Sequence, residues 1–369
     1  MKSILGPNVL PLTSPRPMAT EPESARIGPV DRLARPLRDL RLSVLDRCNL
    51  RCTYCMPEES LQGQGVFLPR EQLLTDDELV RLVRIFTRLG VNKIRLTGGE
   101  PLLRPGFSDL VECIAAEPRI DDLALTTNGV LLPRHAEALR RAGLGRIPVS
   151  LDSLDESTFR VLSGHRGSAG EVLEGIAAAE AAGFRSLKIN CVVQRGVNDE
   201  GVEAMVNHFR GTGHVLRFIE FMDVGNLNHW NREQVVPSAE LLARIHARWP
   251  LRPMAPSAPG ETARRYAFED GQGEVGFIAS ITQPFCGDCT RARVTADGNF
   301  YTCLFAGRGA ALRPLLRQGP DEALQEFLEQ RWSRREDRYS EVRSRSGAPK
   351  GDETGSGHEP RVEMFRMGG

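Results

Sequence analysis

The amino-acid sequence predicts an α/β fold, an incomplete (βα)6 TIM-like barrel with a smaller C-terminal α+β domain. Two observations support this prediction. From Arg41 onward, six short apolar runs alternate with amphipathic stretches, which is the pattern of parallel strands connected by helices. Polar residues and glycines gather directly after these runs, at the strand ends where barrels hold their functional groups. A complete barrel of this kind would contain two more units.

The barrel is expected over residues 38–250. Its strands are predicted at 41–46, 92–98, 121–129, 146–152, 186–194 and 214–222. The clearest helix covers 75–89, where Thr75 and Glu78 have capping-box spacing and Gly90 follows as a stop signal. Amphipathic helices of this type cover a parallel sheet by turning their apolar face toward it.

After a helix expected at 237–248 the pattern changes. Strand-like segments follow at 263–270, 274–281 and 292–305, and Asp297 with Gly298 forms a hairpin turn signal inside the last of them. We therefore expect the smaller α+β domain over residues 251–332.

The two ends of the chain have a different composition. Seven of the 24 prolines fall within the first 36 residues, which predicts a flexible extension over 1–37. Residues 333–360 contain few apolar side chains and are expected to form a polar linker. The final segment, 361–369, becomes apolar again and ends in two glycines.

Composition excludes several classes of protein. Forty-eight basic residues balance 48 acidic ones, so no overall charge attracts nucleic acid or an anionic membrane, and neither is expected as a partner. No apolar stretch approaches the roughly 18 residues of a membrane span. The amino terminus lacks the features of a signal peptide, which predicts a cytoplasmic protein with reduced cysteines.

Cys48, Cys52 and Cys55 follow the first expected strand with the spacing C-x3-C-x2-C. Three thiolates without a nearby histidine leave a tetrahedral zinc ion one ligand short. A 4Fe-4S cluster held by three cysteines instead has one open iron, which can bind a further ligand. We favour the cluster, and structural zinc ligands remain the alternative.

Cys286, Cys289 and Cys303 form a second set, with the third thiol across the expected hairpin turn. A zinc site would again need a fourth ligand, and no cysteine or histidine nearby in the sequence supplies it. A second 4Fe-4S cluster with its own open iron is therefore predicted. Cys113 and Cys191 have no partners at ligand spacing and are expected in the core.

The motif CTYCMP and the later TGGEP together resemble the radical S-adenosylmethionine superfamily. The resemblance implies that the amino and carboxylate groups of S-adenosylmethionine bind the open iron of the first cluster. Gly98 and Gly99 would let the backbone approach the methionyl group, and Glu100 could accept its ammonium.

Longer stretches narrow the resemblance to one family. RLSVLDRCNLRCTYCMPEE, FCGDCTRARVTADGNFYTCLF and the terminal Gly-Gly resemble the GTP 3′,8-cyclases of molybdenum cofactor biosynthesis, the MoaA family. The likeness runs from about Leu37 to Phe305 and implies a radical S-adenosylmethionine enzyme with two 4Fe-4S clusters. Such an enzyme converts GTP to 3′,8-cyclo-7,8-dihydroguanosine triphosphate and releases 5′-deoxyadenosine and methionine.

The same resemblance implies partners and site residues. The partners are GTP, an external electron donor and the next enzyme, cyclic pyranopterin monophosphate synthase, with a monomer or homodimer expected. The positions that match GTP contacts are Arg41, Arg95, Thr126, Lys188, Arg291 and Arg293. The positions that match S-adenosylmethionine contacts are Tyr54, Gly99, Ser150 and Met222. Gly368 and Gly369 match a tail that reaches the active site.

Charge and strand geometry give the arginines independent support. A triphosphate carries about four negative charges, so a protein of zero net charge must concentrate cations locally to bind it. Arg291 and Arg293 alternate along an expected strand and should therefore share one face.

Some positions depart from the family pattern. Thr290 and Leu45 replace the usual Asn and Thr, and Ile147 with Pro148 precedes SLDS where a polar Asn is usual. Pro148 cannot donate a backbone hydrogen bond, which puts the pairing of that strand in doubt. The long polar linker should lower the effective concentration of the tail.

Two other functions remain open at this point. The first is a different radical S-adenosylmethionine enzyme with an auxiliary cluster, such as a peptide-modifying maturase, although maturases usually carry more cysteines near the carboxyl end. The second is a non-enzymatic metal-binding sensor that binds nucleic acid through the six arginines of residues 331–345.

Overall fold

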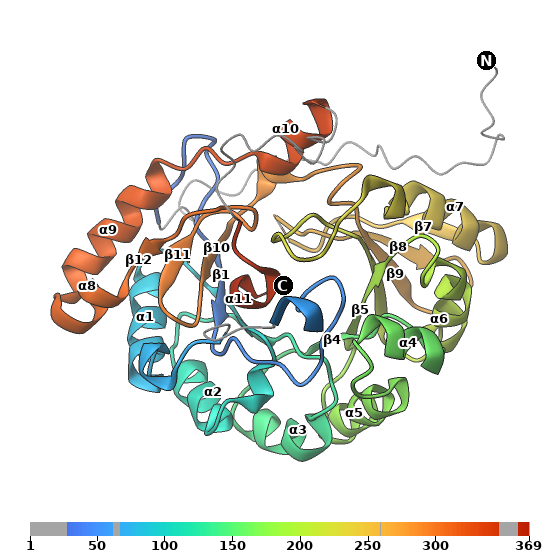
Figure 1. Ribbon diagram of the computed structural model, residues 1–369, viewed down its shortest axis with the longest axis horizontal. Coiled ribbons are helices and arrows are strands. Elements are labelled where there is room, and N and C mark those ends of the chain that lie inside the picture. Colours follow the sequence, from blue (N-terminus) through green and yellow to red (C-terminus); the bar gives the residue numbers. More distant parts are fainter. Residues whose placement is uncertain (1–27, 62–66, 259, 347–360, 369) are drawn as a thin grey trace.

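The computed structural model describes residues 28–61, 67–258, 260–346 and 361–368 (Figure 1). Its strands are β1 Asp39–Ser43, β2 Lys93–Thr97, β3 Asp122–Leu125, β4 Pro148–Ser150, β5 Lys188–Val193, β6 Val215–Glu220, β7 Leu251–Pro253, β8 Arg264–Phe268, β9 Glu274–Ile278, β10 Arg291–Val294, β11 Asn299–Tyr301 and β12 Ala310–Ala311. Its α-helices are α1 Asp76–Arg88, α2 Phe107–Ala115, α3 Leu132–Arg141, α4 Glu156–Leu162, α5 Ala169–Ala181, α6 Val202–Phe209, α7 Ser238–Arg248, α8 Arg313–Gln318, α9 Asp321–Ser333, α10 Tyr339–Ser346 and α11 Met364–Met367.

The six expected barrel strands form, each overlapping its predicted run. Strands β1, β2 and β3 pair in parallel, as do β4, β5 and β6. Parallel bridges from Ala124 to Arg146 and from Thr127 to Val149 connect β3 with β4. Helices α1 to α6 surround the strands, as Figure 1 shows. The predicted incomplete barrel is thereby confirmed.

The carboxyl-terminal strands extend the barrel at both edges. Strand β10 pairs in parallel with β1, and β9 pairs in parallel with β6. Antiparallel partners then continue outward, β11 and β12 on one side and β8 and β7 on the other. An incomplete barrel leaves two strand edges with unpaired backbone groups, and these additional strands satisfy them. The boundary between the barrel and the smaller domain, predicted at residue 250, is not tested by this pairing and remains a prediction.

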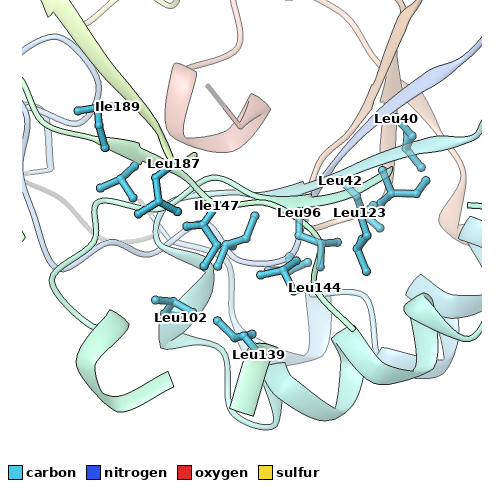
Figure 2. Packing of buried hydrophobic residues seen from close by; sticks show 14 of the residues in the cluster. Leu40, Leu42, Leu96, Leu102, Leu123, Leu139, Leu144, Ile147, Leu187 and Ile189 are labelled. Carbon is cyan, nitrogen blue, oxygen red and sulfur yellow. The ribbon is translucent and has the colours of Figure 1, made fainter. Parts of the chain in front are cut away.

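The main core lies between the strands and the surrounding helices. Leu40, Leu42, Leu96 and Leu123 project outward from β1, β2 and β3 toward the helices (Figure 2). Because side chains alternate along a strand, the residues between these leucines face the barrel interior. The alternation thus separates an apolar outer layer from a polar interior.

Helix α1 confirms the sequence expectation for this segment in detail. Thr75 accepts from the backbone of Glu78, and the Glu78 side chain accepts from the backbone of Thr75, forming the predicted capping box. The predicted turn at Asp297 and Gly298 also forms and joins β10 to β11.

Two expectations about the chain ends are wrong within the described residues. Asp31, Arg35 and Leu37 are buried, so residues 28–37 are not a flexible extension. Arg335 and Arg343 are also buried, and α10 lies inside the segment expected to be a linker. Their charges are paired with buried carboxylates, so high polarity did not mean exposure to water. Residues 1–27 and 347–360 lie outside the described residues.

The strand at Pro148 pairs normally on both sides. Pro148 lies opposite Lys188 of β5, and its carbonyl accepts a hydrogen bond from Thr127 N at 3.2 Å. The missing N–H therefore does not prevent β4 from forming. Across the described part of the chain, no helix combines the length and apolar character needed to cross a membrane.

Candidate active site

A row of arginines faces the barrel interior. Arg41 on β1 lies opposite Arg293 on β10 and opposite Arg95 on β2, in register across three adjacent strands. Burial, followed by the charges of Arg293 and Arg95, lowers the pKa of Arg41 well below its usual value. Arg41 Nε and Thr126 Oγ1 are buried and have no hydrogen-bond partner among the residues that the structure describes. Such a row of buried, mutually repelling cations is suited to binding an anion.

The opposite wall adds two cations. Lys188 begins β5, and burial together with Arg217 lowers its pKa to about 8. Arg217 on β6 donates to Asn190 Oδ1 through Nε at 3.0 Å and through Nη2 at 2.6 Å. A cavity of about 520 Å³, whose lining includes Lys188, Arg217, Arg252 and Arg265, opens at the amino-terminal ends of β5 and β6.

Arg217 was not identified from the sequence. The signal was available, because this arginine interrupts the apolar run HVLRFIEFM of an expected strand. Only 8% of its surface is exposed, and charged side chains are seldom so buried without a specific reason.

The first cysteine loop follows the carboxyl end of β1. Burial raises the pKa of Cys52 well above its usual value, and the nearby Cys48 and Cys55 raise it further. Burial and the carboxylate of Glu100 raise the pKa of Cys48 to about 11. The three predicted ligands therefore lie close enough for their charges to influence one another.

The glycine pair after β2 packs against this loop. A Cβ at Gly98 would lie 2.1 Å from the carbonyl oxygen of Leu45, and one at Gly99 would lie 2.2 Å from that of Arg47. Gly99 N donates to the Leu45 carbonyl at 2.8 Å. The glycines thus allow the TGGEP segment to contact the backbone that precedes Cys48, a role that the motif alone does not reveal.

Glu100 is buried beside the same loop. It accepts hydrogen bonds from Thr127 Oγ1 and from the backbone of Asn128, both at 2.8 Å. Burial raises the pKa of Glu100 to about 7. Asn128 Nδ2 donates to Asn49 Oδ1 at 2.8 Å, which connects the loop after β3 to the cysteine loop.

A second buried carboxylate, Asp152, lies near the first cysteine loop. Tyr54 donates to Asp152 Oδ2 at 2.7 Å, and Val192 N donates to Oδ1 at 2.8 Å. Burial raises the pKa of Asp152 to about 6. Ser150 is half-buried at the end of β4, two residues before it. Asp152 was not singled out from the sequence, although it lies in the SLDS motif at a strand end.

Met222 belongs to a small apolar cluster at the same place. Its buried residues are Tyr54, Phe221, Val224 and Met364, and the half-buried Cys52, Cys55 and Met222 pack against them. The cluster brings the first cysteine loop, the segment after β6 and the carboxyl-terminal tail together.

The second cysteine loop has different electrostatic surroundings. Burial raises the pKa of Cys303 to about 11, with Cys289 and Cys286 also contributing. Burial alone would raise the pKa of Cys289 too, but the charges of Arg291 and Arg335 outweigh it and lower the pKa to about 6. Arg291 Nη2 donates to Cys289 Sγ at 3.4 Å. The three thiols again lie near one another.

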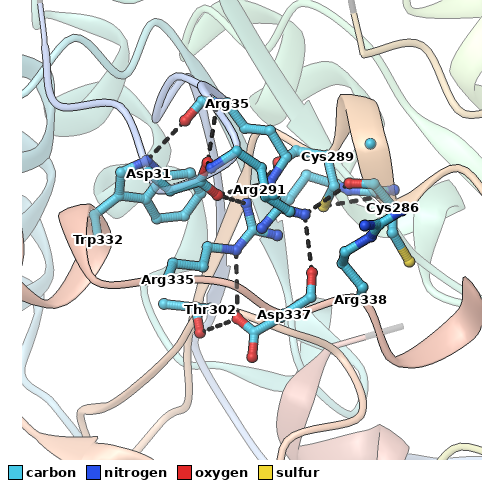
Figure 3. Close-up of polar contacts among 12 residues, drawn as sticks. Asp31, Arg35, Cys286, Cys289, Arg291, Thr302, Trp332, Arg335, Asp337 and Arg338 are labelled. Carbon is cyan, nitrogen blue, oxygen red and sulfur yellow. Dashed lines mark hydrogen bonds and ion pairs between the residues drawn. The ribbon is translucent and has the colours of Figure 1, made fainter. Parts of the chain in front are cut away.

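Two buried arginines donate hydrogen bonds to the backbone of this loop (Figure 3). Arg35 Nη1 donates to the carbonyl of Cys286, and Arg335 Nη1 donates to that of Cys289, both at 2.7 Å. Both guanidinium groups also pair with Asp31 Oδ2, at 2.6 and 3.2 Å. We call Asp31, Arg35 and Arg335 the arginine clamp. The sequence does not reveal the clamp, because composition predicts a flexible extension for the segment that holds Asp31 and Arg35 and a polar linker for the segment that holds Arg335.

The two remaining cysteines differ in burial. Cys191 is buried, as expected, whereas Cys113 is exposed on α2 and its assignment to the core was wrong. Within the described residues, no three His, Cys, Asp or Glu side chains are arranged to enclose a single metal ion.

The carboxyl-terminal tail enters the barrel. Helix α11 lies at its centre in Figure 1, and Arg293 Nη1 donates to the Gly368 carbonyl at 2.7 Å. Gly368 has φ of +69°, and a Cβ there would lie 2.1 Å from Thr97 Cγ2. Glycine is therefore required by both conformation and space at this position. Gly369 lies outside the described residues.

Comparison with known proteins agrees with this arrangement. Residues 42–209 match the radical SAM superfamily, and residues 214–341 match the family described as Molybdenum Cofactor Synthesis C. A protein of Xanthomonas campestris pv. campestris named GTP 3′,8-cyclase is 58% identical over 339 residues, covering 92% of this chain and 97% of the relative. One of the same name from Acidothermus cellulolyticus is 51% identical, covering 92% and 98%.

A solved structure shares the fold. The crystal structure of Streptococcus suis SuiB bound to S-adenosylmethionine has a TM-score of 0.56 and 15% identity. The match covers 84% of this chain and 68% of SuiB. At this identity the likeness supports the architecture alone.

Proposed function

The chain belongs to the GTP 3′,8-cyclase family of radical S-adenosylmethionine enzymes, and on this premise we propose how its own residues serve the reaction. The reaction converts GTP and S-adenosylmethionine to 3′,8-cyclo-7,8-dihydroguanosine triphosphate, 5′-deoxyadenosine and methionine. It is an early step of molybdenum cofactor biosynthesis. The observation that carries the assignment of substrate contacts is the row of Arg293, Arg41 and Arg95 between the two cysteine loops.

Cys48, Cys52 and Cys55 hold the 4Fe-4S cluster that the superfamily uses. When bound, this cluster and S-adenosylmethionine supply an organic radical able to remove hydrogen from an unactivated carbon. The cofactor carries a positive sulfonium and an ammonium group. The buried carboxylates Glu100 and Asp152 near these cysteines favour such a cation, and Tyr54, Gly98, Gly99, Ser150 and Met222 complete the proposed cofactor site.

Cys286, Cys289 and Cys303 hold a second 4Fe-4S cluster in this proposal. Metal ligation requires thiolates, and Arg291 and Arg335 stabilise the thiolate of Cys289. The open iron of such a cluster would offer a binding position for a group of the substrate. The adjacent arginine row then receives the triphosphate, with Lys188, Arg217 and Thr126 on neighbouring walls.

The tail completes the site from the carboxyl end. Gly368 and Gly369 are proposed to lie beside the bound ligands, where a larger residue would occupy their space. The hydrogen bond from Arg293 to Gly368 links the tail to the proposed phosphate site.

Several partners follow from the chemistry. Reductive cleavage of S-adenosylmethionine consumes an electron, so an external electron donor is required. The cyclised nucleotide passes to cyclic pyranopterin monophosphate synthase. We further propose a cytoplasmic monomer or homodimer. Neither a membrane nor nucleic acid is proposed as a partner, because the balanced charge provides no overall attraction for them.

The test uses anaerobically reconstituted protein with GTP, S-adenosylmethionine and dithionite. We expect about eight irons per chain, since each three-thiolate set holds four, together with 5′-deoxyadenosine and the cyclised triphosphate detected by mass spectrometry. Cys113→Ala serves as a matched control, because Cys113 is exposed and distant in sequence from both sets. Stoichiometric zinc with little iron would contradict the proposal.

A further inference from the structure

The described tail, residues 361–368, has two halves with different contacts. The inner half is α11 with Gly368, and it touches the barrel wall through Ser43 Oγ, which donates to the Arg366 carbonyl at 2.9 Å. The outer half, Arg361 to Glu363, lies against the segment 221–228 that follows β6. The outer contacts are mainly polar, whereas Met364, Phe365 and Met367 of the inner half are buried.

Asp223 is the centre of the outer contacts. Arg361 Nη1 donates to Asp223 Oδ2 at 3.1 Å and to the Asp223 carbonyl at 2.8 Å. Tyr339 of α10 donates to Oδ2 at 2.6 Å, and Arg343 of α10 pairs with Oδ1. The Arg361 guanidinium also lies 4.7 Å from the centre of the Tyr339 ring. One buried carboxylate thereby joins the tail to α10.

Asn226 forms hydrogen bonds with the backbone and with a side chain of the same short segment. Its N–H and Nδ2 donate to Glu363 Oε1 at 3.0 and 2.9 Å. Its Nδ2 donates to the Arg361 carbonyl at 2.6 Å, and its Oδ1 accepts from Arg361 N at 3.1 Å. A Cβ at Gly225, where φ is +80°, would lie 2.2 Å from Glu363 Oε2. The loop therefore fits this segment closely.

We infer that Arg361 and Glu363 are an anchor that positions the terminal glycines, and that Asp223 and Asn226 are the receptor for this anchor. The inference rests on the proposed function of the tail. The anchor residues contact the loop after β6 rather than the arginine row, so they act as positioning residues. Their contribution is to raise the fraction of molecules in which the glycines occupy the barrel.

The position of this receptor also determines which part of the site the tail contacts. The loop that carries Asp223 also carries Val224, which packs with Met364 and Tyr54 in the apolar cluster. Docking of the anchor therefore places α11 against the first cysteine loop, and Arg293 holds the far end at Gly368. The tail is fixed at both ends of its short helix.

The test uses full-length reconstituted protein carrying Gly368→Ala and Gly369→Ala, and a synthetic peptide RVEMFRMGG that matches residues 361–369. The altered tail of the chain and the added peptide compete for one receptor. Fluorescence anisotropy of the labelled peptide gives its half-saturating concentration. Product formation in the same samples gives the maximal restored rate.

We expect Arg361→Ala in the peptide to raise the half-saturating concentration about tenfold, in line with the loss of charge-assisted hydrogen bonds. The same substitution in the chain should lower that concentration for the unaltered peptide, because the chain's own tail then competes less. The maximal restored rate should stay the same in both cases. Asn226→Ala removes contacts from the added peptide and from the competing tail alike, so it should change the half-saturating concentration less than Arg361→Ala in the peptide does, and it leaves the pairing of Asp223 with Arg343 intact.

Arg334→Ala is the matched control, because this arginine is exposed after α9 and should change none of these values. Equal binding of the Arg361→Ala, Glu363→Ala and unaltered peptides would overturn the anchor. A weaker unaltered peptide on the Arg361→Ala chain would also overturn it, since it would indicate an effect on folding. Peptide binding as expected without cyclised product in any sample would contradict the proposed function and leave the anchor standing.

Discussion

The cysteines of the two loops are half-buried to a similar degree, yet the charges that most affect their pKa values differ. Burial raises the pKa of Cys48 to about 11 beside Glu100, and it raises that of Cys55 beside Cys48 and Glu363. In the second loop the pKa of Cys303 is likewise raised to about 11, but at Cys289 the charges of Arg291 and Arg335 outweigh burial and lower the pKa to about 6. Burial therefore does not distinguish the loops, whereas the adjacent side chains do.

This difference indicates which ligand each loop suits. Carboxylates near the first loop favour a cation, and S-adenosylmethionine carries both a sulfonium and an ammonium group. Guanidinium groups near the second loop favour an anion, and GTP carries about four negative charges. The contrast supports a division of labour in which one loop serves the cofactor and the other serves the substrate.

Removing a cysteine from either loop is the strongest test of this division. Cys52→Ala should abolish cleavage of S-adenosylmethionine, because the first cluster would be lost. Cys289→Ala should abolish cyclisation of GTP while some uncoupled 5′-deoxyadenosine still forms. Each variant should retain about four irons per chain, since one cluster remains. Iron analysis and chromatography of 5′-deoxyadenosine measure both effects, and equal loss of cleavage in folded, iron-loaded variants would contradict the comparison.

The arginine clamp provides the next largest effect. Arg335→Ala leaves Asp31 with one fewer cationic partner and removes the hydrogen bond to the Cys289 carbonyl. Because Asp31 keeps Arg35 as a partner, the loss is that of hydrogen bonds to a charged group, which lowers the free energy of unfolding by about 1.5–3 kcal/mol. We expect a lower thermal midpoint and selective loss of iron from the second cluster.

The control for the clamp is its neighbour in the sequence. Arg334 is exposed, and Arg334→Ala should change the free energy of unfolding by less than about 0.5 kcal/mol. Electron paramagnetic resonance distinguishes the two reduced clusters. If Arg335→Ala reduced both cluster signals to the same extent, the clamp would have no particular connection with the second loop.

The arginine row can be tested with two ligands that differ only in phosphate. Arg41→Ala should weaken GTP binding by about 10- to 100-fold, the range for hydrogen bonds to a charged group, and should change guanosine binding far less. Anaerobic calorimetry measures both affinities. An equal loss for GTP and guanosine would show that Arg41 contacts the base or sugar, or acts through folding.

Local patterns in the sequence were sufficient for much of the fold. Apolar alternation located the six barrel strands, and the Thr75 and Glu78 spacing located the start of α1, because these signals depend on residues close together in the chain. They could not show that β9 and β10 would pair with β6 and β1, since pairing of distant strands depends on which edges remain free.

The site was predictable to a similar extent. Its cysteines and the alternating Arg291 and Arg293 follow from spacing. The clamp does not, because Asp31 and Arg335 are 304 residues apart and each lies in a segment of polar composition. Composition alone cannot distinguish a solvated charge from a charge paired with a distant partner in the folded protein.

The smallest expected effect concerns Lys188 and the pH dependence of GTP binding. Burial, followed by the charge of Arg217, lowers the pKa of Lys188 to about 8 from the usual 10.5. The ammonium form binds phosphate, so affinity should be highest below pH 8 and should fall as the pH rises and the proton is lost. Between pH 7 and pH 9 a single group of this kind gives a decrease of about tenfold. Lys188→Met should bind GTP more weakly at pH 7 and lack this decrease, whereas Lys188→Arg should remain charged and depend less on pH.

Because GTP itself titrates, the quantity to compare is the ratio of wild-type to Lys188→Met affinity, measured by anaerobic calorimetry at each pH. A ratio that stays constant from pH 7 to pH 9 would show that Lys188 does not contact the phosphates, and it would limit the substrate-binding charge to the arginines.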